Sequence, residues 1–148
     1  MNRLLVTFFL LSSLSGCATV RNDHFTTPVP AELGNSLAAD AIKQLQTLYP
    51  PAHTKFNIGQ PVPKTDSFGT SLVFHLREKG YAVQEYNLRQ PIDAGNGLSL
   101  QYAVDRPASS LFQGLYRVQL KVGKAILTRA YTAGNNTANP AGAWAKME

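Results

Sequence analysis

Two stretches of the chain carry hydrophobic residues at steps of three and four, the spacing of one face of an amphipathic helix. The first predicted helix begins near Ser36, where Asn35 or Ser36 can cap it by accepting hydrogen bonds from free backbone N–H groups. It ends at Tyr49, because Pro50 and Pro51 lack an N–H and disfavour helix in the residue before them. Its hydrophobic face consists of Ala38, Ala41, Ile42, Leu45, Leu48 and Tyr49.

The second predicted helix begins at Asp66 or Ser67, either of which can act as its N-cap. Lys79 and Gly80 end it, since a cation is favourable in the last turn and glycine readily adopts the left-handed conformation that closes a helix. Its buried face consists of Phe68, Leu72, Val73 and Leu76. A strand follows after this one glycine, which indicates that the helix packs onto a sheet.

Other stretches favour strands, and the clearest of them alternate hydrophobic and polar residues, as strands with one covered face do. The predicted strands are Thr54 to Ile58, Tyr81 to Tyr86, Leu98 to Asp105, Tyr116 to Val122, and a last strand that follows Gly123-Lys124. Gly123-Lys124 suits a two-residue hairpin turn. That turn places Leu127 opposite Leu120, Tyr131 opposite Tyr116 and Arg129 opposite Val118. A charged residue on the hydrophobic side indicates that this face is only partly covered near Arg129.

These elements predict an α+β fold: two helices packed on one face of a mainly antiparallel sheet of about five strands, in a two-layer sandwich. The last three strands form a meander. From Ala133 onward the chain is rich in Gly, Asn and Pro, and a loop-like tail is expected. Trp144 in this tail either folds back onto the core or is exposed for a partner, and we expect it to fold back.

The N-terminus has the form of a secretory signal, with a basic residue at Arg3 and a hydrophobic run from Leu4 to Leu14. That run is about eleven residues long, shorter than the roughly twenty that a membrane-spanning helix needs. The sequence Leu14-Ser15-Gly16-Cys17 resembles the lipobox of bacterial lipoproteins. The resemblance implies cleavage between Gly16 and Cys17, and an S-diacylglycerol and an N-acyl chain on Cys17. An ordinary signal peptide with a chance cysteine is the alternative.

The lipid chains would hold the protein stably at a bilayer, because more than one acyl chain is needed for a stable anchor. Ala18 occupies the position after the cysteine. By resemblance to enterobacterial lipoproteins, Ala rather than Asp at this position implies the outer membrane.

The predicted organisation is a signal peptide over 1–16, the lipidated cysteine and a flexible linker over 17–35, and a single α+β periplasmic domain over 36–148. The linker includes Thr26-Thr27-Pro28-Val29-Pro30, which favours an extended backbone. It is either a plain tether, which we favour, or a docking strand that becomes ordered on a partner.

Charge and cysteine content narrow the possible functions. Cleavage would remove one of the 14 basic residues and none of the 9 acidic ones, so 13 basic residues would remain and the net charge would be about +4. The basic residues are scattered, whereas nucleic-acid binding usually needs a basic patch. Cys17 has no partner in the chain, so no disulfide framework is expected.

No catalytic, metal or cofactor site is predicted. His24, His53 and His75 are far apart and lack the spacing of metal ligands. The chain has no Gly-rich phosphate loop and no Gly-x-Ser-x-Gly nucleophile turn. The acidic residues Asp40, Asp66, Glu78, Glu85 and Asp105 are dispersed. We therefore expect a protein that is not an enzyme and that has no small-molecule substrate.

Several segments, taken in order, resemble the TrbH family, the lipoproteins of P-type conjugative transfer systems. They are Leu48-Tyr49-Pro50-Pro51-Ala52, Phe68-Gly69, Leu76-Arg77-Glu78-Lys79-Gly80-Tyr81-Ala82-Val83, Leu100-Gln101-Tyr102-Ala103-Val104-Asp105, Leu115-Tyr116-Arg117-Val118 to Val122-Gly123, Arg129-Ala130-Tyr131 and Pro140-Ala141-Gly142-Ala143-Trp144. The resemblance covers about 36–148 and the lipobox.

The resemblance implies a lipid-anchored component of a conjugative type IV secretion system at the outer membrane. The family has no known catalytic residue to carry over, and Cys17 is the only residue-level transfer. By analogy with the small VirB-class lipoprotein, the chain would brace the channel. Its partners would be other outer-membrane and periplasmic channel subunits, with no direct contact to nucleic acid. The alternatives are a general envelope lipoprotein that binds peptidoglycan or another periplasmic protein, and a periplasmic enzyme or ligand binder.

Overall fold

The computed structural model describes residues 27–89, 96–107 and 114–148, which contain two α-helices, one short 3₁₀ helix and seven strands. In chain order these are α1 (Ala31–Leu48), η1 (Pro51–His53), β1 (Lys55–Ile58), α2 (Ser67–Glu78), β2 (Ala82–Gln84), β3 (Leu98–Asp105), β4 (Leu115–Val122), β5 (Ala125–Gly134), β6 (Thr137–Pro140) and β7 (Ala145–Met147). The α+β class predicted from the sequence is confirmed.

The strands form one mixed sheet in the order β2-β1-β3-β4-β5-β6, with β7 also paired to β5. β1 is parallel to both β2 and β3, whereas all the pairs from β3 to β7 are antiparallel. The parallel pair β1–β2 needs a crossover connection, and α2 provides it. The sheet therefore has seven strands rather than about five, and the additional ones are β6 and β7.

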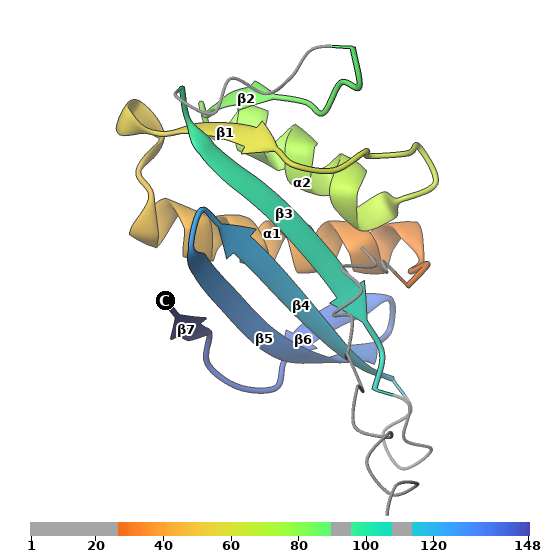
Figure 1. Ribbon diagram of the computed structural model, residues 1–148. Helices are drawn as coiled ribbons and strands as arrows, with labels where there is room; N and C mark the ends of the chain where they lie inside the picture. The colour runs from red at the N-terminus through yellow and green to blue at the C-terminus, as the bar shows by residue number, and fades with distance from the viewer. Residues whose placement is uncertain (1–26, 90–95, 108–113) are drawn as a thin grey trace, which may run out of the picture.

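Both helices lie on the same side of the sheet, behind β3 in the view of Figure 1. The core between helices and sheet includes the predicted hydrophobic face of α2, and Ala38, Ala41, Ile42 and Leu45 of α1. From the sheet it includes alternate residues: Leu100, Tyr102 and Val104 on β3, and Val118, Leu120 and Val122 on β4. The residues between them, such as Gln101 and Gln119, lie on the opposite face of the sheet.

The β4–β5 hairpin has the predicted register. Leu120 pairs with Leu127, Tyr116 with Tyr131 and Val118 with Arg129. Gly123 has a φ of 58°, the left-handed conformation expected of glycine in this turn. β2 is shorter than predicted, because Tyr81 lies outside the strand and turns its hydroxyl to the backbone carbonyl of Tyr49, 2.6 Å away.

The predicted start of the first helix at Ser36 is wrong, because α1 begins at Ala31. Its N-cap is Pro30, which has no side-chain cap, and Leu33 and Gly34 in its first turn are buried. A Cβ atom on Gly34 would overlap the Ser67 hydroxyl of α2, so the two helices are in close contact here. Residues 31–35, which we expected to be part of the linker, are therefore helical and packed.

The prediction of a loop-like tail is also wrong. Asn135 and Asn136, with φ values of 50° and 60°, form a tight turn that joins β5 to β6. The tail then returns as β7 beside the start of β5. Trp144 packs against the core, with its ring edge-on to Tyr131 at a centroid distance of 6.4 Å, so the expectation that it folds back is confirmed.

Within the described ranges, no helix is both long and hydrophobic enough to span a bilayer.

We predict that Gly34→Ala destabilises the protein by about 1–3 kcal/mol, because the added methyl group forces α1 away from α2. In an unconstrained helix the same substitution would be stabilising by about 1 kcal/mol, so the sign of the change identifies the close contact. Urea denaturation measures the effect, with Glu32→Ala at an exposed position of the same helix as control. A Gly34→Ala variant as stable as the wild type would contradict the prediction.

Candidate functional site

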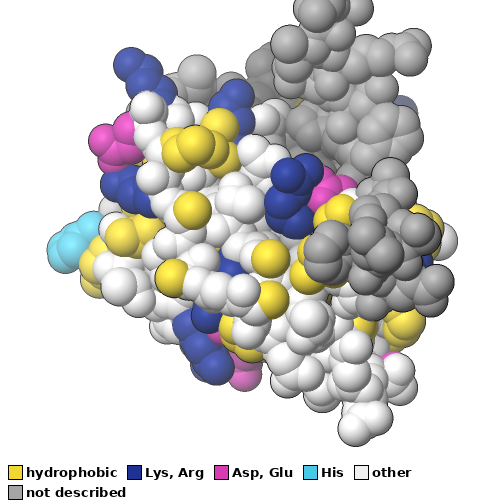
Figure 2. All heavy atoms as spheres, turned by 90° about the horizontal axis from the view of Figure 1, so that it is seen from below, with side chains coloured by type: hydrophobic (Ala, Val, Ile, Leu, Met, Phe, Trp, Pro, Cys, Tyr) yellow, Lys and Arg dark blue, Asp and Glu magenta, His cyan; other side chains and the backbone are white. Residues whose placement is uncertain are grey.

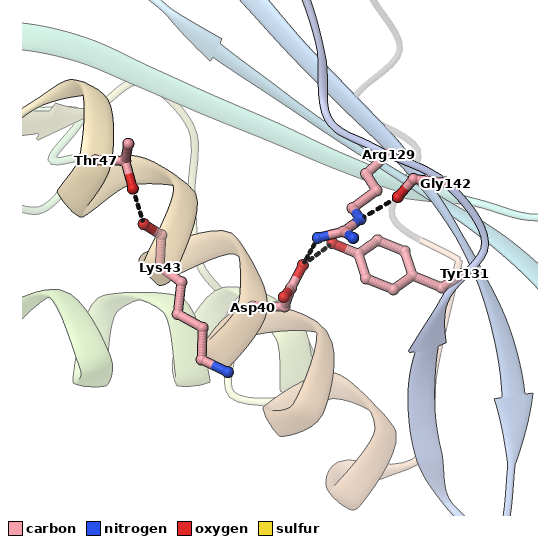
Figure 3. Close-up of polar contacts among 6 residues, drawn as sticks. All are labelled: Asp40, Lys43, Thr47, Arg129, Tyr131 and Gly142. Carbon is pink, nitrogen blue, oxygen red and sulfur yellow. Dashed lines mark hydrogen bonds and ion pairs between the residues drawn. The ribbon is translucent and has the colours of Figure 1, made fainter.

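Two clusters of part-buried polar residues join the helices to the sheet, each built around a tyrosine of the sheet and an aspartate at or beside a helix. We call Asp40, Arg129, Tyr131 and Gly142 the tail cluster. Asp40 comes from α1, Arg129 and Tyr131 from β5, and Gly142 from the connection between β6 and β7. These residues converge because β5 passes beside α1 with its hydrophobic side turned toward the helix (Figure 3).

In the tail cluster, one carboxylate oxygen serves two donors. Asp40 Oδ2 accepts from the Tyr131 hydroxyl and from Arg129 Nη1, both at 2.8 Å (Figure 3). Arg129 Nε donates to the carbonyl of Gly142 at 2.7 Å. The guanidinium therefore links α1 to the C-terminal tail, and the tail holds Trp144 against Tyr131.

The side chains of Arg129 and Asp40 are 20% and 21% exposed, which agrees with the expectation of a partly covered face near Arg129. Removing two charges from water is costly, and this pair compensates through charge-assisted hydrogen bonds. Burial raises the pKa of Tyr131 strongly, and the hydrogen bond to Asp40 and the charge of Asp40 raise it further. Tyr131 is therefore a protonated donor at neutral pH and does not act as a base.

The second cluster, which we call the cap cluster, holds the start of α2. Of the two predicted N-cap candidates, Asp66 is the N-cap and Ser67 begins the helix: Asp66 Oδ1 accepts from the N–H of Gly69 at 2.9 Å. Its Oδ2 accepts from the Tyr102 hydroxyl of β3 at 2.6 Å. The N–H of Tyr102 donates to Gln60 Oε1 at 2.9 Å. A Cβ on Gly69 would overlap the Tyr102 hydroxyl, so this position requires glycine.

A cavity of about 400 Å³ adjoins the cap cluster. It is lined by Thr27, Pro28, Val29, Gln60, Pro61, Pro63, Thr65, Asp66 and Ser67. Both oxygens of Asp66 are already hydrogen-bonded, and Ser67 donates its hydroxyl to the carbonyl of Val29 at 2.8 Å. The polar groups named here hold the N-terminal segment and α2 together, and the arrangement does not form a nucleophile and base pair.

The other acidic residues named from the sequence have separate partners. Asp105 forms a bidentate pair with Arg117, and Glu85 pairs with Arg77. His75 lies half-buried at the surface of α2, where it binds Glu78 through Nδ1 at 3.1 Å and Asn35 through Nε2 at 2.8 Å. His53 is exposed in η1, and His24 lies outside the described residues, as do Gly16 and Cys17.

The part of the chain that the structure describes contains no group of three His, Cys, Asp or Glu that could hold a metal ion. Figure 2 shows the molecule from below the view of Figure 1, with hydrophobic side chains in small groups. Positive side chains on that face lie beside negative or neutral ones. Among the coloured residues of that face, there is no basic patch of the kind that nucleic-acid binding uses.

Sequence analysis found the cap cluster only in part and did not find the tail cluster. Asp66 and Gly69 are three residues apart, and the capping pattern is local. Asp40 and Tyr131 are 91 residues apart, and no local pattern joins them. The one available signal was Arg129, a charge on the hydrophobic side of a strand, which requires a counter-charge from the opposing helix.

We predict that Asp40→Ala destabilises the protein by about 2–4 kcal/mol, because it leaves Arg129 and Tyr131 without their acceptor. Trp144 is the only tryptophan, so its fluorescence should report release of the tail at a lower urea concentration than global unfolding, which circular dichroism follows. Lys43→Ala, on the same helix but exposed, is the control and should cost less than about 0.5 kcal/mol. Equal stability of the two variants would contradict the role of the tail cluster.

Stability should fall as the pH rises above about 10, the ordinary pKa of tyrosine in an unfolded chain. Burial raises the pKa of Tyr81, Tyr102 and Tyr131 in the folded state. The unfolded state therefore loses these protons first, and alkaline pH favours it. Phenolate absorbance during a pH titration should show these three tyrosines ionising only as the protein unfolds. Tyr131→Phe should reduce the slope of stability against pH, and an unchanged slope would contradict the assignment.

The comparisons with known proteins give one match. A family model described as "Conjugal transfer protein TrbH" matches residues 19–148. No curated protein and no solved structure matches the chain.

Proposed function

Because the chain belongs to the TrbH family of conjugal transfer proteins, we propose that it is a lipid-anchored structural component of a conjugative type IV secretion system at the outer membrane. The observation that carries the proposal is the order of features at the N-terminus. The lipobox Leu14-Ser15-Gly16-Cys17 ends two residues before the family match begins. A signal peptide that ends in a lipidated cysteine would deliver the matched region to the periplasm and keep it at a membrane.

The polar clusters support a structural role rather than a catalytic one. The carboxylates of Asp40 and Asp66 already accept hydrogen bonds from tyrosine, arginine and backbone donors. A carboxylate that already accepts these hydrogen bonds stabilises the fold and is not poised for proton transfer. The domain would brace channel assembly through its surface, with other outer-membrane and periplasmic subunits as partners.

The entry of the chain into the domain supports an anchor close to the folded part. The N–H of Thr27 donates to the carbonyl of Val104 at 2.7 Å, at the end of β3. Thr27 lies ten positions after Cys17, and an extended chain of that length spans at most about 36 Å. Lipidation of Cys17 would therefore keep the end of β3 within that distance of the bilayer surface.

We predict that Cys17→Ser abolishes lipidation, so that the protein either is released from the membrane or retains its signal peptide. Mass spectrometry of the protein from membrane and soluble fractions measures this, and density-gradient separation of the membranes identifies which one holds the wild type. Thr19→Ser, which leaves the lipobox intact, is the control. An unchanged lipidated mass in Cys17→Ser would refute the anchor.

A crosslinked pull-down of the tagged protein from detergent-solubilised donor cells tests the role itself. Recovery of large channel subunits with the wild type would support a secretion-system component. Their loss in Cys17→Ser would show that the anchor positions the contact, and their retention would place the contact in the folded domain. Recovery of general envelope proteins alone would refute the proposed role.

A further inference from the structure

The solvent side of the two helices has a shallow groove between the second half of α1 and the end of α2. We call it the helix groove. Its volume is about 160 Å³, and Ala39 and Ile42 line it from α1, with His75 and Glu78 on α2. Ile42 is 2% exposed, so the groove opens onto the edge of the hydrophobic core. An apolar depression between two neighbouring helices is where the ridge of a third helix packs.

Phe74, beside this groove, is 64% exposed. The other large hydrophobic residues of α2 are all buried: Phe68, Leu72, Val73 and Leu76. The Phe74 ring lies edge-on to His75, with the ring centroids 5.4 Å apart, so it adjoins the groove. An exposed aromatic ring next to an apolar depression is typical of an anchor residue in a protein interface.

The helix groove carries a net positive charge, with two lysines and one glutamate among its lining residues. Lys43 on α1 and Lys79 at the end of α2 line it, and neither forms an ion pair within the described ranges. Figure 3 shows the carboxylate of Asp40, the nearest acidic residue of the same helix, directed at Arg129 and Tyr131 instead of at Lys43. The hydrogen bond from His75, and then the charge of Lys79, lower the pKa of Glu78, which already has His75 as a partner. The groove thus carries two lysines against one carboxylate, and this net positive charge favours an acidic partner.

The charges favour a different protein over a second copy of this chain. In a two-fold symmetric dimer the same surface meets itself, so four lysines would meet only two Glu78 carboxylates, and the two surfaces would carry net positive charge toward each other. Like charges placed together oppose association. A partner that presents carboxylates to both lysines and hydrophobic residues to Phe74 would complement the charge of the lysines and bury the exposed ring.

We propose that the helix groove binds an amphipathic helix with Asp or Glu on its flanks, from another protein. The hydrophobic face of that helix would cover Ala39 and Phe74, and its carboxylates would pair with Lys43 and Lys79. This mode of recognition, an amphipathic helix in an apolar groove, is common between proteins. The proposal rests on the proposed function in one respect, because the partner is sought among the subunits of the transfer channel.

The experiment places a photo-crosslinking amino acid, p-benzoylphenylalanine, at Gln46 in the groove, in the full chain and in cells with a complete transfer system. Gln119, on the opposite face of the sheet, is the matched control position. We expect the probe at Gln46 to form an adduct with one other protein. The probe at Gln119 should form no adduct with that protein. Peptide mapping should locate the adduct in a helical segment that contains acidic residues.

Two sets of substitutions then test the recognition chemistry. With the probe at Gln46, Phe74→Ser and the pair Lys43→Glu with Lys79→Glu should each lower the adduct yield roughly tenfold or more. The matched charge control is Lys121→Glu with Lys124→Glu, two exposed lysines of the β4–β5 hairpin, and it should leave the yield unchanged. Thermal unfolding of Phe74→Ser and of the charge control should match that of the wild type, because the replaced side chains are exposed. The variant with Lys79→Glu should unfold only a few degrees lower, since it places a negative charge at the C-terminal end of α2.

An adduct with a second copy of the chain, an adduct with lipid, or no adduct would overturn the proposal. So would an adduct whose yield is insensitive to Phe74→Ser and to the charge reversals. These outcomes are independent of the anchor, since Cys17→Ser is assessed by lipidated mass and by membrane fraction. If the protein is lipidated and is recovered with channel subunits but gives no groove adduct, the proposed function stands and the proposal for the helix groove is refuted.

Discussion

The helices are held in position on the sheet by buried tyrosine hydroxyl groups, which must find acceptors. Tyr102 donates to Asp66, Tyr131 to Asp40 and Tyr81 to the carbonyl of Tyr49. Hydrophobic packing alone tolerates small shifts of a helix, whereas a buried hydroxyl without its partner is costly. These three contacts therefore fix the positions of both helices. Close packing at glycine adds to the constraint, since Gly69 leaves room for the Tyr102 hydroxyl.

The same constraint accounts for the carboxylates of Asp40 and Asp66 between the helices and the sheet. A carboxylate suited to acid–base catalysis needs access to a substrate proton, and the carboxylates of Asp40 and Asp66 instead accept hydrogen bonds from the protein. In the tail cluster this arrangement extends to the C-terminus, because Arg129 links Asp40 to the backbone at Gly142. The tail cluster thus connects the first helix to the C-terminal tail. A domain connected in this way can hold its surface regions in fixed positions relative to one another.

The sequence predicted the elements whose patterns are local. Alternation gave the three central strands, and the glycine turn gave the β4–β5 register. The start of α1 was misplaced because Asn35 and Ser36 resemble caps, but their side chains bind His75 and the N–H of Ala138. β6 and β7 were missed because they are short and mostly exposed, which leaves no alternation to detect. The tail cluster depends on pairs about ninety residues apart, and only the folded chain brings them together.

The N-terminal segment and the helix groove are connected through one rigid element. Ser67, at the start of α2, donates to the carbonyl of Val29, and Phe74 follows on the same helix. Seven residues of α-helix span about 10 Å, and the cap cluster fixes the helix to β3 at its first turn. For a protein tethered through its N-terminus, α2 thus sets where the groove lies relative to the membrane. A contact in the groove would then keep a partner within a limited distance of the bilayer, as bracing a channel would require.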